Sequence, residues 1–266
     1  MKVTATFIIV VTLCFVTNVN AAISEEDYAS LREIFSEARL SIMTDEEKEE
    51  LVNGDLTYSE KVYQVTETVN GTFIYSEVDP EIADLIEENF RNGVATYDAT
   101  HETSYKRITI IDNYISINDT HRVMVYTQWL VTPATKSFDV TAMRIDGGSV
   151  VEGTQDGTQT YWKDGSYGYV DYSYNGTNIR KTDNGFGISM NLVNGASYFE
   201  TDISANVIST SQNAVAYGTY QHAVTDVTLD QSQSYTISHN GLGRVLNFTN
   251  SVYNLYDGMT GVSISL

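Results

Sequence analysis

The chain has 266 residues, of which 42% are hydrophobic and 19 are tyrosine, so it can bury a substantial core without covalent crosslinks. Its formal net charge of -20 at pH 7 argues against nucleic-acid partners and anionic lipid headgroups, because both bind to cationic surfaces. The single cysteine, Cys14, lies in the first apolar stretch. An exported protein that lacks this stretch has no thiolate catalysis, cysteine-ligated metal or disulfide.

Residues 1–22 predict a secretion signal. A lysine precedes an apolar run over residues 7–16, and a polar stretch then leads to small residues at Ala21, after which we expect cleavage. A lipid anchor on Cys14 is the alternative, but the bulky Leu13 stands where such motifs need a small residue. No other stretch approaches the roughly 18 apolar residues of a membrane-spanning helix. We therefore expect an extracellular protein with no integral membrane span.

Residues 23–93 predict an acidic helix–hairpin–helix region. They carry 19 Asp and Glu against five Lys and Arg. A first helix is expected after the N-cap Ser24, because apolar residues over 28–38 recur on one helical face. A last helix is expected to begin at Asp79-Pro80, an order favoured at helix starts, and to end at Asn92-Gly93.

Two further elements are predicted between these helices. Thr44 and Glu47 form a capping box for a short, charged surface helix, and Asn53-Gly54 is expected to end it in a left-handed conformation. From residue 60 to residue 78 the hydrophobic period changes to two, with Asn70-Gly71 in the middle. This pattern predicts a β-hairpin with a tight turn.

Residues 94–266 predict an antiparallel β domain, a β-sandwich or two packed sheets, with no convincing helix. Runs rich in Thr, Tyr, Ile and Val alternate with turn residues such as Asn118-Asp119, Asp156-Gly157 and Asp164-Gly165. The predicted strands cover residues 94–99, 103–117, 121–132, 136–146, 157–163, 167–175, 178–183, 186–193, 197–208, 214–222, 225–230, 234–238, 243–249 and 260–266.

A cluster of aromatic residues is the candidate ligand-binding site. It consists of Tyr161, Trp162, Tyr167, Tyr169, Tyr172 and Tyr174. Alternation along a strand places Tyr167 and Tyr169 on one face, and Tyr172 and Tyr174 on another. Flat amphipathic rings bind sugars or proline-rich peptides by stacking. The alternative is that the tyrosines cover a sandwich face by cross-strand pairing.

Acidic residues are numerous enough to supply a glycosidase pair, which needs two facing carboxylates. The available ones are Asp139, Asp146, Glu152, Asp156, Asp164, Asp171 and Glu200. Because a sequence does not show which of them converge, we assign no catalytic residue.

Metal and cofactor signals are weak. The histidines, His101, His121, His222 and His239, are too dispersed for a zinc motif, and we interpret them as surface or sheet-edge residues. Oxygen-rich loops at Asp146-Gly147-Gly148 and Asp156-Gly157 could hold calcium, although ordinary turns explain them equally well. We therefore assign no metal ligand and expect no cofactor, with calcium as the open alternative.

Several strings between residues 103 and 222 resemble secreted β-rich proteins of Gram-positive bacteria to which no activity is assigned. The strings are Thr103-Ser104-Tyr105-Lys106, Trp129, residues 133–140, residues 157–162, residues 184–191 and residues 218–222. The resemblance covers a little under half of the chain. It implies a bacterial, exported β-protein and transfers no catalytic residue.

The sequence thus favours a secreted or cell-surface, non-enzymatic protein that binds an extracellular glycan or protein through its tyrosine-bearing β face. Two alternatives stay open. One is a pore-forming protein, because residues 197–238 alternate small polar and apolar residues as membrane-inserting hairpins do. The other is a secreted glycan hydrolase with paired carboxylates.

Overall fold

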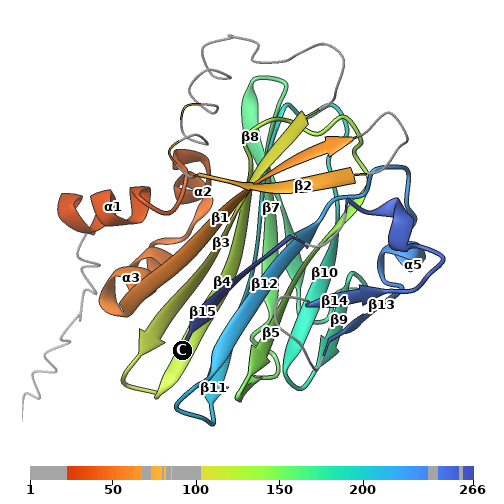
Figure 1. Cartoon of the computed structure of the whole chain (residues 1–266). Helices are drawn as coiled ribbons and strands as arrows, with labels where there is room; N and C mark the ends of the chain where they lie inside the picture. The colour runs from red at the N-terminus through yellow and green to blue at the C-terminus, as the bar shows by residue number, and fades with distance from the viewer. Residues whose placement is uncertain are drawn as a thin grey trace, which may run out of the picture.

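A computed structural model of the chain describes residues 23–67, 73–79, 81, 85, 103–238, 245–257 and 260–266. Two antiparallel sheets pack face to face, with helices against one outer side and a small hairpin against the other (Figure 1). The predicted mainly β, sandwich fold is confirmed. Several predicted features lie outside the described residues: the signal peptide, the Asn70-Gly71 turn, strand 94–99, most of the helix after Asp79-Pro80, and the histidines His101 and His239.

The larger sheet has the strand order β2-β1-β3-β4-β11-β7-β8, with β6 paired to β11. Its strands are β1 (Asp55–Glu67), β2 (Phe73–Val78), β3 (Thr103–Ile115), β4 (Thr120–Trp129), β6 (Gly148–Val150), β7 (Asp156–Lys163), β8 (Ser166–Ser173) and β11 (Tyr198–Ser209). Strands β1 and β2 pair in antiparallel fashion, as the predicted hairpin requires. Strand β1 also pairs with β3 from Asp55↔Tyr114 to Thr66↔Thr103, so the two predicted regions of the chain meet within one sheet.

The smaller sheet has the order β15-β12-β5-β10-β9. Its strands are β5 (Phe138–Asp146), β9 (Ile179–Thr182), β10 (Gly185–Asn191), β12 (Val215–Gln221) and β15 (Thr260–Ser265). The core between the two sheets is built from alternate residues of both, including Ile110, Val125, Met143, Phe186 and Phe199, all fully buried. Side chains that alternate in and out along each strand supply this core.

Each sheet is covered on its outer side as well. Helices α1 (Glu25–Arg32), α2 (Glu37–Ile42) and α3 (Asp45–Asn53) pack Leu31, Phe35 and Leu40 against Ile111 and Tyr126 of the larger sheet. On the smaller sheet lie α5 (Leu229–Ser232), the pair β13 (Tyr235–Ile237) and β14 (Leu246–Phe248), and the 3-10 turn η1 (Tyr253–Leu255). The described molecule therefore has four layers, visible from left to right in Figure 1.

The single first helix predicted over residues 28–38 is wrong, because the chain makes two helices there. Ser36 adopts an extended conformation and its side chain accepts a hydrogen bond from Arg39 N, which starts α2. Phe35 stays buried in the turn between the helices, at 2% exposure. The helical spacing of apolar residues therefore continues across the turn between α1 and α2, so this spacing does not reveal the turn.

Helix α3 has the predicted capping box, in which Thr44 and Glu47 exchange hydrogen bonds. Its predicted left-handed end is wrong, since Gly54 has φ -98° and ψ 172°, which is extended. A Cβ on Gly54 would lie 1.9 Å from Asn113 Oδ1. The glycine is needed here for close approach to β3 and not for backbone conformation.

Another predicted strand, over residues 225–230, is also wrong. Helix α5 begins there, with Thr228 and Gln231 forming a second capping box. The predicted turn residues Asp119 and Asp164 do lie in turns, with positive φ of 49° and 52°. Gly157 instead lies inside β7, where a Cβ would be 2.8 Å from the backbone oxygen of Asp202.

Candidate functional site

The outer face of the larger sheet carries three rows of paired side chains next to the helices. The strand register aligns Tyr198 with Trp162 and Tyr167 in the first row. The second row aligns Glu200, Thr160 and Tyr169, and the third aligns Asp202, Thr158 and Asp171. Directly paired residues of an antiparallel sheet point to the same side. An aromatic row therefore borders two rows that carry carboxylates.

Three of the six predicted binding residues, Trp162, Tyr167 and Tyr169, lie on this outer face. The rings of Trp162 and Tyr167 meet edge to face with centroids 4.6 Å apart. Tyr167 and Tyr169 are 49% and 57% exposed. Tyr198, 6.3 Å from Tyr167 between ring centroids, completes the row and was missed by the sequence analysis. Only the pairing of β11 with β7 brings it to this place.

The other three predicted residues do not join that row. Tyr161 and Tyr172 point inward and pack against the core between the sheets. Burial raises the pKa of Tyr172 to about 12, partly offset by its hydrogen bond from Gln159. Tyr174 follows β8, where its hydroxyl donates to Glu152 and Lys181 Nζ lies 3.3 Å from its ring centroid. The predicted separation of Tyr172 from Tyr167 and Tyr169 holds, but half of the cluster serves packing or a local contact.

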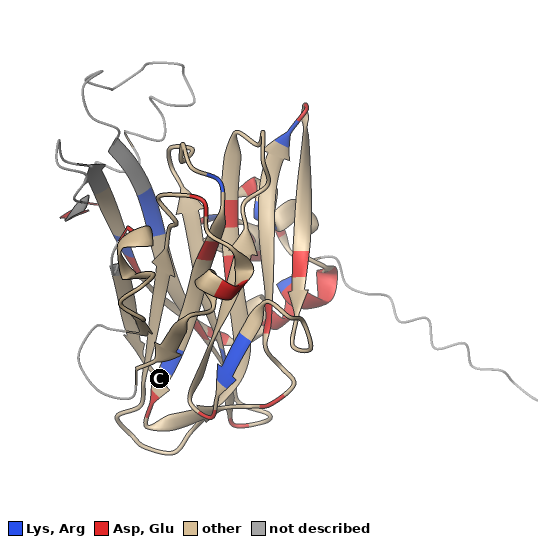
Figure 2. Cartoon of the chain, turned by 90° about the vertical axis from the view of Figure 1, so that its right-hand side faces the viewer, with Lys and Arg blue, Asp and Glu red and all other residues tan. Residues whose placement is uncertain are grey.

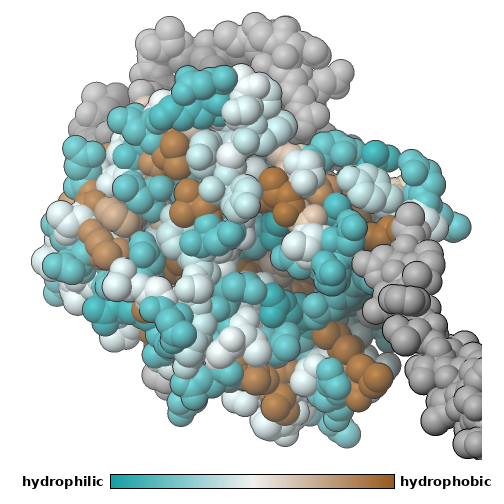
Figure 3. Space-filling model, turned by 180° about the vertical axis from the view of Figure 1, so that it is seen from behind, coloured by the Kyte–Doolittle hydropathy of each residue, from teal (hydrophilic) through white to brown (hydrophobic). Residues whose placement is uncertain are grey.

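A groove of about 580 Å³ lies between the helices and this outer face. Helices α2 and α3 line one side of it, and β7 and β8 line the other. The lining residues used below are Arg39, Glu47, Glu50, Arg122, Asp156, Tyr169, Asp171 and Asp202. On the face of the molecule shown in Figure 3, hydrophobic residues are scattered among hydrophilic ones.

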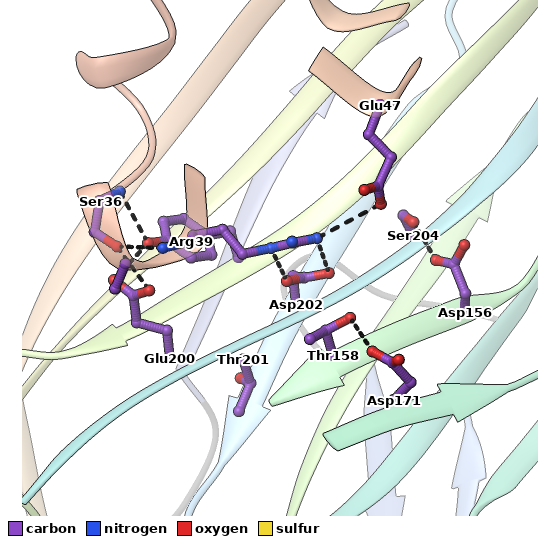
Figure 4. A network of polar contacts seen from close by, with 12 residues as sticks. Ser36, Arg39, Glu47, Asp156, Thr158, Asp171, Glu200, Thr201, Asp202 and Ser204 are labelled. Carbon is purple, nitrogen blue, oxygen red and sulfur yellow. Dashed lines mark hydrogen bonds and ion pairs between the residues drawn. The ribbon is translucent and has the colours of Figure 1, made fainter. Parts of the chain in front are cut away.

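The inner end of the groove is fixed by a buried ion pair. Arg39 of α2 donates from Nε to Asp202 Oδ1 at 2.6 Å and from Nη2 to Asp202 Oδ2 at 3.3 Å (Figure 4). Both side chains are at most 5% exposed. Burial raises the pKa of Asp202 to about 6, and the charge of Arg39 opposes that rise. This pair holds α2 against β11.

Glu200 provides a second attachment of the helices to the sheet. Its carboxylate is fully buried and accepts hydrogen bonds from Ser36 Oγ, Tyr126, Gln128 and Tyr198. Because every partner donates to it, the carboxyl group has hydrogen bonds on both oxygens without a cation. Glu200, one of the acids considered for hydrolysis, is therefore occupied by structural bonds.

The charge that remains in the groove is negative. Arg122 Nη2 lies 2.7 Å from Asp156, which leaves both arginines of the lining paired with aspartates. Glu50 and Asp171 are exposed and have no ion pair within the described residues, and Glu47 lies 4.0 Å from Arg39. Acidic positions are spread over both helices and strands of the molecule (Figure 2).

Two other acids proposed for hydrolysis lie elsewhere. Asp139 is completely buried beside His222 on the smaller sheet, and Asp146 binds Arg144 at 3.0 Å. The Asp156 side chain, from the second suggested calcium loop, pairs with Arg122. Among the described side chains, no group of three or more His, Cys, Asp or Glu is placed to hold a metal ion. Calcium binding therefore stays a prediction without a defined site.

The pore hypothesis drew on a segment that contributes to both sheets. Strand β11 pairs with β4 and β7, whereas β12, the next strand along the chain, pairs with β5 and β15. The two consecutive strands do not pair with each other as a hairpin. Within the described part of the chain, no helix is long and apolar enough to span a bilayer.

No protein-family model and no curated protein sequence matches the chain. Three solved structures illustrate its structural similarities. The collagen-binding domain of a Staphylococcus aureus adhesin is 12% identical over 56% of this chain and 89% of its own, with a TM-score of 0.29. The C-terminal domain of the Streptococcus agalactiae AgI/II polypeptide BspA is 10% identical over 68% and 82%, with a TM-score of 0.23. The membrane-inserted Clostridium perfringens NetB toxin is 8% identical over 62% and 84%, with a TM-score of 0.19. At these TM-scores the similarities carry no argument about function.

Proposed function

We propose that the chain is a secreted or cell-surface, non-enzymatic binding protein whose groove holds a basic segment of another extracellular protein. The observation that carries this proposal is the surplus of carboxylates in the groove: Glu50 and Asp171 have no ion pair within the described residues, and Glu47 shares Arg39 with Asp202. A lysine or arginine side chain entering the groove meets these carboxylates. It also reaches the ring of Tyr169, which is 57% exposed.

Three physical effects favour the binding of a basic segment in this groove. Carboxylates beside a concave, partly apolar surface attract cations more strongly than the same groups on a flat surface. An aromatic face adds a cation–π contribution. The buried pair Arg39–Asp202 and the satisfied Glu200 hold the two sides of the groove in fixed relation, so little ordering is required on binding.

A binding experiment with an oligolysine peptide and a neutral oligoglutamine control tests this proposal. We expect the double variant Glu50→Gln/Asp171→Asn to weaken oligolysine binding by about tenfold, as expected for the loss of two exposed ion pairs. The matched control Asp164→Asn/Asp183→Asn removes the same charge from two exposed turns and is expected to bind as wild type does. If both double variants weaken oligolysine binding equally, the peptide is attracted by overall charge alone, and the groove is not its binding site.

The aromatic row favours a second candidate, a glycan that stacks on Trp162 and Tyr167. These rings and Tyr198 form a continuous outer surface, and stacking on such rings is a common mode of sugar binding. A glycan array probed with wild type and with Tyr167→Ala/Tyr169→Ala tests it. A signal that disappears in the variant supports a glycan ligand, and equal signals reject the aromatic surface as the binding site.

A further inference from the structure

Four of the strings noted in the sequence converge on one buried cluster that shares no residue with the lining of the groove. Lys106 is a buried residue of β3 in the larger sheet, while Asp139 and Tyr220 belong to β5 and β12 of the smaller one. Trp129 ends β4, and His222 follows β12. His222 is 7% exposed, so its interpretation as a surface or sheet-edge residue is wrong.

The centre of the cluster is a lysine facing an aspartate. Lys106 Nζ lies 2.7 Å from Asp257 Oδ2, and the two residues are 0% and 1% exposed. The amine lies 5.2 Å from the ring centroid of Tyr220 and 5.8 Å from that of Trp129. Trp129 Nε1 donates to the Tyr220 hydroxyl at 2.9 Å, which fixes both rings. The aromatic side chains limit the access of water to the pair.

The carboxyl group of Asp257 is held in a defined orientation. Its Oδ1 accepts the backbone N–H of His222 at 3.0 Å. Asp139 holds that segment in place by accepting the backbone N–H of Ala223 at 2.9 Å and by contacting His222 Nδ1 at 2.9 Å. An N–H aimed at a carboxyl oxygen stabilises the negative charge that develops there when a nucleophile attacks the carbon.

Burial in this cluster acts against the ionised form of Asp257. Burial raises the pKa of Asp257, and the charge of Lys106 opposes that rise. Transfer of a proton from ammonium to carboxylate gives a neutral amine and a neutral acid, which lose less by desolvation than two ions do. A neutral amine held against a neutral carboxylic acid, with water excluded, is the arrangement that amide formation needs.

We propose that Lys106 and Asp257 form an intramolecular amide bond after the chain folds. A bond forms between Lys106 Nζ and Asp257 Cγ, and the Cγ–Oδ2 bond breaks. One proton from Nζ and the departing hydroxyl leave as water, so no oxidant or other reactant is consumed. The backbone N–H of His222 stabilises the tetrahedral intermediate, and Asp139 is the positioning residue, because it binds the Ala223 N–H and the His222 ring on either side of that group.

The bond ties the larger sheet at β3 to the segment that leads into β15 of the smaller sheet, 151 residues further along the chain. It constrains the unfolded state as a disulfide does, in a chain whose only cysteine lies in the predicted signal. Two other ion pairs lack the required chemistry. Arg39 is a charged guanidinium that stays protonated, and Lys61 with Glu77 is exposed to water on the surface.

Intact-mass measurement on the purified, folded full chain tests the proposal. We expect wild type to be lighter than its sequence mass by one water molecule, and Lys106→Arg to have its full sequence mass. Comparing the two removes any effect of processing at the N-terminus. Proteolytic digestion of wild type is expected to yield a branched peptide that joins the segments containing Lys106 and Asp257. Lys61→Arg, the control, is expected to keep both the water loss and the branched peptide.

Two results would overturn the proposal. The first is folded wild type at its full sequence mass. The second is loss of water that persists in Lys106→Arg without a branched peptide, because Asp257 precedes Gly258 and this dipeptide can cyclise to a succinimide. If Lys106→Arg does not fold, the branched peptide from wild type still distinguishes the amide from a succinimide, because a succinimide loses the same water without joining the two segments. Asp139→Asn, checked for folding by circular dichroism, is expected to show an increased fraction without the amide.

Discussion

Gly218 of β12 faces Val125 of β4 across the sandwich so closely that a Cβ on the glycine would lie 2.6 Å from Val125 Cγ2. Val125 is completely buried in the core between the sheets. The two sheets can approach this closely only because residue 218 is a glycine. A core packed at crystal-like density has no room for another carbon atom.

Gly218→Ala is expected to lower the free energy of unfolding by about 1–3 kcal/mol, the usual range for overpacking a core. The double variant Gly218→Ala/Val125→Ala is expected to be less destabilised than the sum of its single variants, since the second change makes room for the first. Urea denaturation measures all three free energies. Strict additivity would contradict the contact.

Removal of Arg39 is expected to lower the free energy of unfolding by about 3–5 kcal/mol, because Arg39→Ala leaves the Asp202 carboxylate buried without its partner. Arg32→Ala is the control. Arg32 is 45% exposed, its ion-pair partners are exposed glutamates and it lies over the ring of Tyr28, so its loss should change stability by at most about 1 kcal/mol. If both variants lose the same amount, the buried pair does not hold the helices.

Stability should depend on pH through Asp202. Its pKa rises from 3.8 to about 6 on folding, so between these values the folded state binds more protons than the unfolded state. Asp202 therefore stabilises the folded state fully below pH 3.8, and this stabilisation is lost as the pH rises through about 6. The free energy of unfolding falls by about 3 kcal/mol over this range. Asp202→Asn is expected to be less stable overall and to lack this fall when denaturation is repeated from about pH 4 to pH 7. An unchanged pH slope would count against the buried carboxyl group as its source.

Glu200→Gln is expected to destabilise the protein by about 1–3 kcal/mol, although it changes few atoms. The carboxylate receives hydrogen bonds only from donors, including Ser36, Tyr126 and Gln128. An amide NH2 replaces one acceptor oxygen, so at least one of these donors loses its acceptor, and a hydroxyl in that place must turn to accept from the amide instead. Glu46→Gln on the exposed side of α3 controls for the loss of charge and should be near neutral, within about 0.5 kcal/mol. Thermal unfolding of the two variants should separate these effects.

Local sequence patterns predicted much of the secondary structure correctly. The capping box of Thr44 and Glu47, the paired strands on either side of Asn70-Gly71 and the turn at Asp164 all depend on neighbouring residues. The errors at Ser36 and over residues 225–230 arose where an apolar or β-forming pattern outweighed a capping signal that was also present.

The sequence alone determined that this is a strand-rich, acidic chain with one cysteine, because composition, alternation and turn residues act locally and can be read without partners. Only the tertiary structure decided which side chains meet. Tyr198 joins Trp162, Arg39 reaches Asp202 and Lys106 faces Asp257 over separations of up to 163 residues. Strand order and register set those encounters, and both result from the packing of the whole core.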